Sequence, residues 1–156
     1  MFVCLGNICR SPVAEAAFTH LVHENKLQKK FMADSSGTSA YHIGADPDPR
    51  MQATAEKNGV EMNHSAQQFK KEHFDKFDII FAMDSSNYDD IVSLTQNQKL
   101  RKKVYMFRDF DPKAVSNGAD VPDPYYRGGM EAFDEVFDIA YRTCEQILSK
   151  LKAKEL

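Results

Sequence analysis

The sequence VCLGNICRSP, residues 3–12, joins the first apolar run of the chain to a segment with helical spacing. The run from Met1 to Cys4 has the apolar character of a buried strand. Apolar residues from Val13 to Val22 then recur at the spacing of a helix face, and Ser11 followed by Pro12 suits a helix cap and a first helical position. We therefore expect a strand, a tight loop and a helix in direct succession.

Three further apolar runs have the length of buried strands: Phe31 to Ser35, Phe77 to Met83 and Val104 to Phe107. A last helix is predicted from about Met130, because apolar residues follow one helical face while acids come early and lysines late. Strands that alternate with helical patterns are typical of a parallel α/β sheet. The prediction is one α/β domain over residues 1–156.

Composition narrows the class of protein. The chain has 156 residues, 42% hydrophobic and 28% charged, as in ordinary folded domains. Its net charge of -3 argues against nucleic acid as the main partner. No run approaches the ~20 apolar residues of a membrane span, and no basic region of a signal peptide is present. We expect a cytoplasmic protein with no membrane partner.

The three cysteines, Cys4, Cys9 and Cys144, argue against a disulfide framework, because their number is odd and the chain is large enough to fold without one. These cysteines are instead candidates for reactive thiols. Only three residues precede Cys4, so the first strand spans about 10 Å, and we expect the charged amino terminus to lie near the loop.

The loop from Leu5 to Cys9 lies where parallel α/β sheets bind ligands, beyond the carboxyl end of a strand. A loop that enters a helix there points backbone NH groups and the positive end of the helix dipole into one concavity, which binds anions. The thiolate of Cys4 would be stabilised by these NH groups, by Arg10 and by Ser11. Since arginine binds two phosphoryl oxygens at once, the spacing predicts phosphate binding with attack by Cys4.

Cys4 also has a simpler interpretation. A cysteine followed six residues later by an arginine occurs by chance, and buried cysteines are usually inert packing. Here the pattern coincides with Gly6, which permits close backbone approach, and with a helix that opens at Ser11. We therefore favour the nucleophile.

Three segments resemble the low-molecular-weight protein tyrosine phosphatases: VCLGNICRSP at residues 3–12, AMDSSN at residues 82–87 and DPYY at residues 123–126. The resemblance extends over nearly the whole chain. It implies a four-stranded parallel sheet flanked by helices, a phosphate-binding loop between the first strand and first helix, no metal and no organic cofactor. It also implies hydrolysis of phosphotyrosine and other aryl phosphates through a phosphocysteine, inhibition by phosphate-like oxyanions, and phosphotyrosine-bearing proteins and a tyrosine kinase as partners.

By position, the resemblance makes Cys4 the nucleophile, Arg10 the ligand of the phosphoryl oxygens and Asp123 the general acid. The phosphate loop then comprises Leu5, Gly6, Asn7, Ile8, Cys9 and Ser11. Residues assigned to supporting hydrogen bonds are Asn7, Ser11, Ser35 and His64, with Asp84 orienting Arg10. The residues assigned to the substrate cleft are Tyr41 and His42, where the family varies, and the aromatic pair Tyr125 and Tyr126.

The residues alone do not select the general acid. Asp46, Asp48 and Asp111 also precede prolines, a common turn pattern. Asp123 differs because prolines flank it on both sides and two tyrosines follow it, which could stack on a planar leaving group.

Other candidate residues have alternative interpretations. Without the resemblance, His64 is interpreted as a surface histidine and Asp84 as the cap of a helix over residues 85–96. Tyr41 and His42 fit an ordinary exposed loop equally well. Cys9 is either a thiol that resolves oxidised Cys4 as a disulfide or a small apolar residue packed under the loop.

Two other functions remain open. A thiol-dependent arsenate reductase of the same fold would relay electrons through a further pair of cysteines, but only Cys144 lies outside the loop, on an apolar stripe typical of core. A non-catalytic phosphocysteine carrier or phosphotyrosine-binding module would not need both Arg10 and Asp123.

Overall fold

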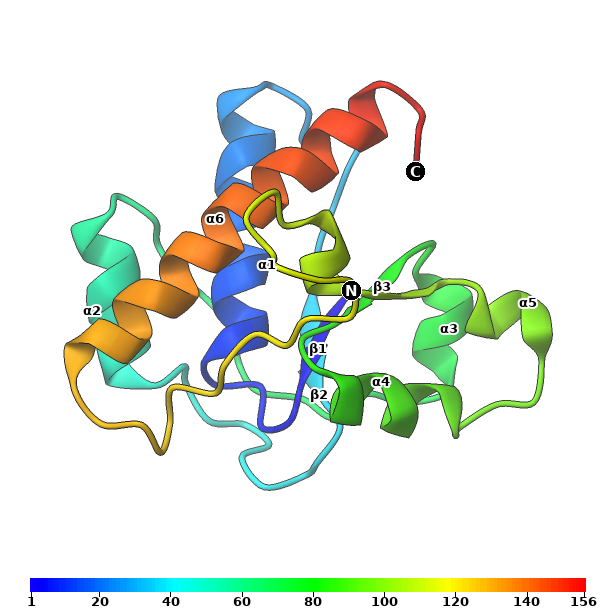
Figure 1. Ribbon diagram of the computed structural model, residues 1–156, viewed down its shortest axis with the longest axis horizontal. Helices are drawn as coiled ribbons and strands as arrows, with labels where there is room; N and C mark the ends of the chain where they lie inside the picture. Colours follow the sequence, from blue (N-terminus) through cyan, green and yellow to red (C-terminus); the bar gives the residue numbers. More distant parts are fainter.

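Four short parallel strands form one sheet in the computed structural model, which describes residues 1–156 (Figure 1). The strands are β1 Phe2–Cys4, β2 Ser35–Gly37, β3 Ile80–Ala82 and β4 Val104–Met106. Their spatial order is β2-β1-β3-β4, so β1 has a partner on each side. A strand in this position is buried on both faces, which explains the continuous apolar run at the start of the chain.

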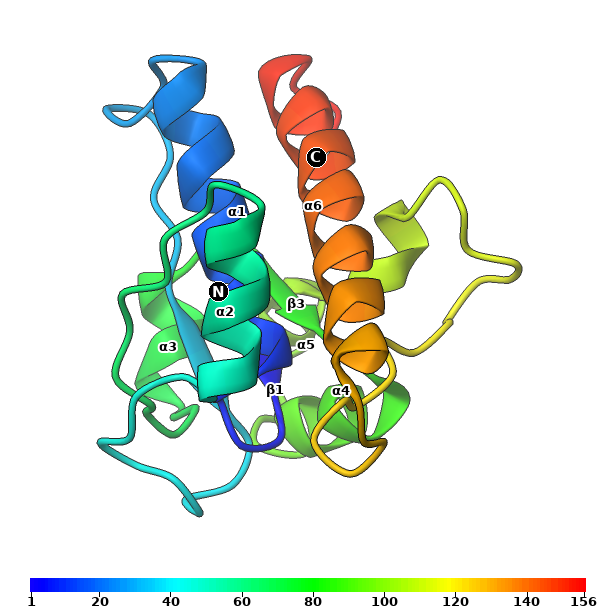
Figure 2. The ribbon, with the colours of Figure 1, turned by 90° about the vertical axis from the view of Figure 1, so that its left-hand side faces the viewer.

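Helices cover both faces of the sheet, as predicted. The elements on one side are α1 Arg10–Glu24, α2 Pro49–Lys57, α6 Met130–Lys152 and the 3-10 turn Phe107–Phe110, and Figure 2 shows α1 and α6 next to each other. Those on the other side are α3 Glu72–Lys76, α4 Ser85–Val92 and α5 Gln98–Arg101. None of the helices combines the length and the apolar character needed to cross a bilayer.

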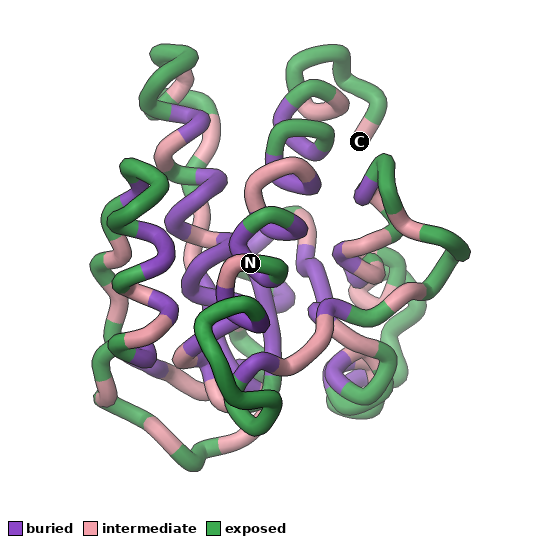
Figure 3. The backbone as a smooth tube through the Cα atoms, turned by 60° about the vertical axis from the view of Figure 1, so that its left-hand side comes forward, coloured by how far each residue is buried: buried purple, intermediate pink, exposed green.

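Each face of the sheet has its own apolar core. Phe2 and Cys4 belong to a core of 25 buried residues shared with α1 and α6, whereas Val3 belongs to a core of 9 with Phe74 and Ile91. This follows from the alternation of side chains along a strand. Figure 3 shows buried positions in the strands and on the inner sides of the helices. Cys4 thus ends β1 on the face that α1 covers.

The second strand lies later in the chain than the sequence pattern indicates. The prediction was Phe31 to Ser35, but β2 spans Ser35–Gly37, where Ser36 pairs with Val3 and Gly37 with Cys4. Phe31 packs against the core from the irregular segment before β2. A buried strand made of two serines and a glycine has no apolar signal, so the pattern indicates the nearest apolar residues instead.

Two predictions about the start of the chain are wrong. Ser11 does not cap the first helix, because α1 already begins at Arg10 and its cap residue, Cys9, makes no side-chain capping bond. The Ser11 hydroxyl instead faces Cys4 inside the protein. The amino group of Met1 donates to the carbonyl of Ile79 at 2.9 Å, at the end of β1 away from the loop.

Candidate active site

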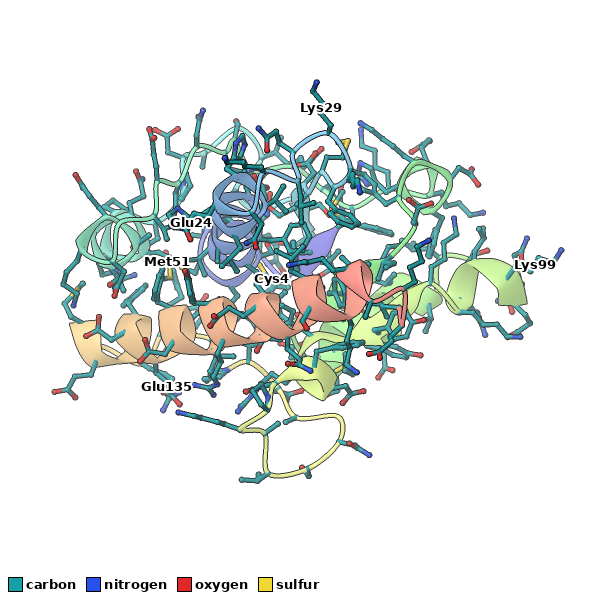
Figure 4. The ribbon with its side chains drawn as sticks, turned by 90° about the horizontal axis from the view of Figure 1, so that it is seen from above. Cys4, Glu24, Lys29, Met51, Lys99 and Glu135 are labelled. Carbon is teal, nitrogen blue, oxygen red and sulfur yellow. The ribbon has the colours of Figure 1, made fainter.

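The loop between β1 and α1 encloses the side chain of Cys4. Asn7 has a φ of 58°, and its backbone NH donates to Cys4 Sγ at 3.3 Å. Ser11 Oγ lies 2.9 Å from the same sulfur. Cys4 is only 2% exposed, and Figure 4 shows it in the interior of the molecule. The loop thus places a backbone donor and a hydroxyl group next to the sulfur.

Arg10, the first residue of α1, extends its guanidinium between two carboxylates. Nη1 donates to Asp84 Oδ2 at 2.6 Å and to the carbonyl of Val121 at 3.2 Å, and Nη2 lies 3.4 Å from Asp123 Oδ2. Burial works to lower the pKa of Arg10, but the negative charges of Cys4, Asp84 and Asp123 outweigh it and raise the pKa above its usual range. The structure therefore holds a permanent cation beside the sulfur.

The carboxylate of Asp84 makes two contacts at once, one as a helix cap and one with Arg10. One oxygen accepts the backbone NH of Asn87 at 2.7 Å in a capping box that starts α4, and the other accepts Arg10. The helix that it caps ends at Val92, short of the predicted residue 96. One carboxylate thus fixes the helix start and the arginine together.

The side chain of Asn7 is the centre of a second hydrogen-bond network. Its Nδ2 donates to Ser11 Oγ at 2.8 Å and to Ser35 Oγ at 3.0 Å. Its Oδ1 accepts the backbone NH of Gln67 at 2.9 Å and lies 2.6 Å from His64 Nε2. These four contacts hold Asn7 in its left-handed conformation, which few residues without this support would adopt.

His64 is not a surface histidine, because its side chain is only 8% exposed. Nδ1 lies 3.1 Å from Glu15 Oε1, so the ring connects α1 to Asn7. Glu15, Asp34 and His64 are also close enough together to hold a metal ion. However, Glu15 accepts the hydroxyl of Ser35 at 2.7 Å and Asp34 accepts the side chain of Gln67 at 3.0 Å. Ser35 and Gln67 both bond to Asn7 as well, so these contacts connect the cluster to the loop.

Comparison with known proteins decides what kind of protein contains this loop. The family model for low molecular weight phosphotyrosine protein phosphatases matches residues 1–156. The chain belongs to this family. A phosphatase of that name from Gallus gallus is 41% identical over 151 residues, which is 96% of this chain and 93% of the relative.

Solved structures agree on the fold of this phosphatase. A protein tyrosine phosphatase from Entamoeba histolytica with Hepes in its active site is 37% identical, with a TM-score of 0.93 over 99% of this chain and 97% of that one. A Drosophila arginine phosphatase is 30% identical, with a TM-score of 0.85 over 97% of this chain and 96% of the other. The four-stranded parallel sheet predicted from the sequence is thus confirmed.

A cavity at the loop, the candidate active site, is lined only by residues that the sequence analysis singled out. They are Cys4, Leu5, Gly6, Asn7, Ile8, Cys9, Arg10, Tyr41, His42, Asp123, Tyr125 and Tyr126. Tyr41 and Tyr126 are 76% and 83% exposed at the rim. The His42 ring lies 6.2 Å from the Tyr125 ring and closes over Gly6, where an added Cβ would lie 3.0 Å from it. The cavity lining does not include Ser11, Ser35, His64 or Asp84, which instead contact its residues Cys4, Asn7 and Arg10 through hydrogen bonds.

Four residues that contact the candidate site were not found from the sequence. Glu15 and Gln67 complete the network around Asn7. Gly37 leaves room for the loop, because a Cβ there would lie 2.5 Å from the Leu5 carbonyl oxygen. Arg50 contacts Tyr125. All but Glu15 lie far along the chain from the loop, and a glycine or a glutamine has no local pattern that reveals such a contact.

Proposed function

We propose that this phosphatase hydrolyses phosphotyrosine in proteins, and other aryl phosphate monoesters, with Cys4 as nucleophile, Arg10 as phosphoryl ligand and Asp123 as general acid. The observation that supports these roles best is the meeting of the three side chains in one cavity. Within it, donors face Cys4 Sγ and the Arg10 guanidinium lies between Asp84 and Asp123.

In the first step, Cys4 Sγ attacks phosphorus and the bond from phosphorus to the aryl oxygen breaks. The loop NH groups and Arg10 bind the nonbridging oxygens, where preorganised donors stabilise the transition state. Asp123, 34% exposed beside Arg10, transfers its proton to the departing oxygen. The products are a phosphocysteine and a neutral phenol.

In the second step, water attacks phosphorus while the carboxylate of Asp123 takes its proton. The bond from sulfur to phosphorus breaks, inorganic phosphate leaves, and the Cys4 thiolate is restored. The Asn7 NH at 3.3 Å and Ser11 Oγ at 2.9 Å stabilise the negative charge that returns to the sulfur.

The walls of the cavity favour an aryl ester as substrate. A phenol has a pKa of about 10, so its oxygen leaves more readily than the alkoxide of phosphoserine. The buried position of Cys4 also requires a substrate that reaches inward past aromatic walls. The name of the arginine phosphatase neighbour implies a phosphorylated guanidinium as its substrate, so phosphoarginine is the competing substrate that the test below includes.

The same chemistry suggests the partners and the compartment. Proteins phosphorylated on tyrosine are the substrates, and a tyrosine kinase supplies them. Vanadate and other phosphate-like oxyanions inhibit by occupying the loop. The three cysteines of the chain are unpaired, and Cys4 must stay reduced to act, which favours the reducing cytoplasm.

The test compares initial rates on 4-nitrophenyl phosphate and on peptides that contain phosphotyrosine, phosphoserine or phosphoarginine. We expect turnover of the aryl esters only, competitive inhibition by vanadate, and less than roughly 1% residual activity in Cys4→Ser. Cys144→Ser is the matched control, because Cys144 is buried on α6 and bonds only to the Ala14 carbonyl. Faster hydrolysis of phosphoarginine would overturn the substrate assignment.

The alternative functions are tested with the same protein. Reduction of arsenate in the presence of thioredoxin, without phosphatase turnover, would make the protein a reductase. Stoichiometric phosphotyrosine binding or a stable phosphocysteine without turnover would make it a binding module or carrier. We expect neither result, because Arg10 and Asp123 lie together at the cavity.

A further inference from the structure

An ion pair next to the active site is not used by the mechanism above. The carboxylate of Asp48, 7% exposed, accepts the Nε and Nη2 of Arg50 at 3.1 and 2.8 Å. The same carboxylate accepts the backbone NH of Arg50 at 2.8 Å and so caps α2. The backbone NH of Asp48 in turn donates to the carbonyl of Ile8 at 2.8 Å. The pair is therefore fixed to the phosphate loop.

The guanidinium of Arg50 reaches from this pair to the segment that contains the general acid. Its central carbon lies 5.5 Å from the ring centre of Tyr125 and 4.6 Å from that of Phe133. Phe133 is fully buried on α6. Tyr125 is two residues after Asp123, and its backbone NH donates to Asp123 Oδ1 at 3.1 Å. Arg50 thus connects a rigid helix to the turn that presents the carboxylate.

The segment around Asp123 needs such a connection. Residues 111–129 form no helix or strand. Before Asp123, the backbone NH of Val121 anchors the segment to the Met83 carbonyl at 2.7 Å. After it, the side-chain ion pair is Arg127 with Glu135 at 3.5 Å, both about half exposed. An exposed pair of this kind contributes little. The stacking of Arg50 on Tyr125 is the better anchor on that side.

We propose that Arg50 is a positioning residue for proton transfer: held by Asp48, it fixes Tyr125 and thereby keeps the Asp123 carboxyl over the phosphate loop. This role rests on the proposed function of Asp123 as general acid. Because Asp48 is bonded to Ile8, the pair also sets the distance between the phosphate loop and the acid. Arginine suits this position, since its planar group can form two hydrogen bonds to a carboxylate while it stacks on an aromatic ring.

The experiment measures kcat/KM for a series of aryl phosphates whose phenols differ in acidity. Esters of acidic phenols need little proton donation, whereas esters of weakly acidic phenols depend on Asp123. We expect Arg50→Ala to lower kcat/KM roughly 10- to 100-fold on the weakly acidic phenols and no more than about 3-fold on the most acidic ones. The inhibition constant of vanadate should stay within about 3-fold, because the loop itself is unchanged.

Two further variants separate positioning from general damage. Arg50→Lys keeps a cation beside Asp48 but loses the planar fork, so we expect a smaller loss with the same dependence on leaving group. Lys57 lies on α2, as Arg50 does, and Lys57→Ala removes only an exposed pair with Asp134 of α6, so it should leave every rate unchanged. The double variant Asp123→Asn with Arg50→Ala should be no slower than Asp123→Asn alone, because no acid remains to be positioned.

Other outcomes overturn the proposal. An equal loss on all leaving groups, or an additive loss in the double variant, would show that Arg50 only stabilises the fold or the loop. Unchanged rates in Arg50→Ala would show that the segment does not need it. Absence of turnover by the unmodified protein would be a different failure, that of the proposed function itself.

Discussion

Asp123 is the residue whose role most needs a chemical test. It lies 3.4 Å from Arg10, whereas Asp48 and Asp111, which also precede prolines, bind Arg50 and Arg142 instead. We expect Asp123→Asn to lower kcat/KM by roughly 100- to 10,000-fold on esters of weakly acidic phenols, and by less on acidic ones. The measurement is a leaving-group series at constant pH. Equal losses across the series would make Asp123 structural.

Gly37 is a residue whose importance no sequence pattern revealed. It lies in β2, and a Cβ there would come within 2.5 Å of the Leu5 carbonyl and 3.2 Å of Asn7. Because both neighbours are backbone or buried, the loop must move, and we expect Gly37→Ala to lower kcat about 100-fold and weaken vanadate binding. Both are measured by steady-state kinetics.

The control for Gly37 is Gly59→Ala. Gly59 has a φ of 77° but open space around its Cα, so the substitution should reduce the free energy of unfolding by roughly 1 kcal/mol without changing the rate. If the two variants lost the same activity, the close approach at Gly37 would not matter to the loop.

At the scale of elements, the sequence predicted those parts that are stabilised by apolar burial. α6 was predicted to begin at Met130, and it does, because its apolar stripe packs on α1 and its charges follow the helix dipole. β2 was misplaced, because Ser35 and Ser36 are buried through hydrogen bonds and strand pairing rather than through apolar side chains. The local pattern predicts Ser11 as a helix cap, whereas its hydroxyl contacts Cys4. Polar burial depends on distant partners that local patterns do not contain.

The phosphate loop as an element leads to a prediction on oxidation. Cys9 is 4% exposed, and burial raises its pKa, so it stays a neutral thiol while Cys4 reacts with peroxide. We expect Cys4 to form a sulfenic acid, which Cys9 converts to a disulfide with release of water. Activity should then return with dithiothreitol in the wild type and much less in Cys9→Ser, while Cys144→Ser behaves as wild type. Equal recovery, with no crosslinked peptide by mass spectrometry, would leave Cys9 as packing.

In the whole molecule, the groups that we propose for catalysis come from three distant segments. Cys4 ends β1 and Asp84 follows β3, and since these strands are parallel neighbours, their carboxyl ends meet at one edge of the sheet. The Met83 NH donates to the Val3 carbonyl at 2.9 Å and fixes that edge. This part of the site follows from topology and could be predicted. The place of Asp123 could not, because a segment without helix or strand brings it there.

That segment is anchored to the rest of the protein by Asp111, which suggests a test of stability. Its side chain, fully buried, binds Arg108 of the 3-10 turn at 3.0 Å and Arg142 of α6 at 2.7 and 3.0 Å. Burial acts to raise the pKa of Asp111, but the hydrogen bonds from Arg142 and Lys113 outweigh it and the pKa is lowered. The folded protein therefore binds this proton less readily than the unfolded chain.

The sign of the pH dependence follows from that shift. Ionised Asp111 makes its full contribution to the free energy of unfolding above the pKa of an unfolded aspartate, about 3.9. That contribution is lost as the pH falls through the lower pKa of the folded protein. At pH 7, Asp111→Asn should reduce the free energy of unfolding by roughly 3 kcal/mol, because it leaves two arginines without their anion. Urea unfolding at pH 7 and near pH 3 measures this, and the difference in free energy of unfolding between the variant and the wild type should narrow in acid.

The control is Asp134→Asn, which breaks the exposed pair with Lys57 and should cost less than about 1 kcal/mol at either pH. A gap that stays constant with pH would mean that the charge of Asp111 does not hold the segment in place.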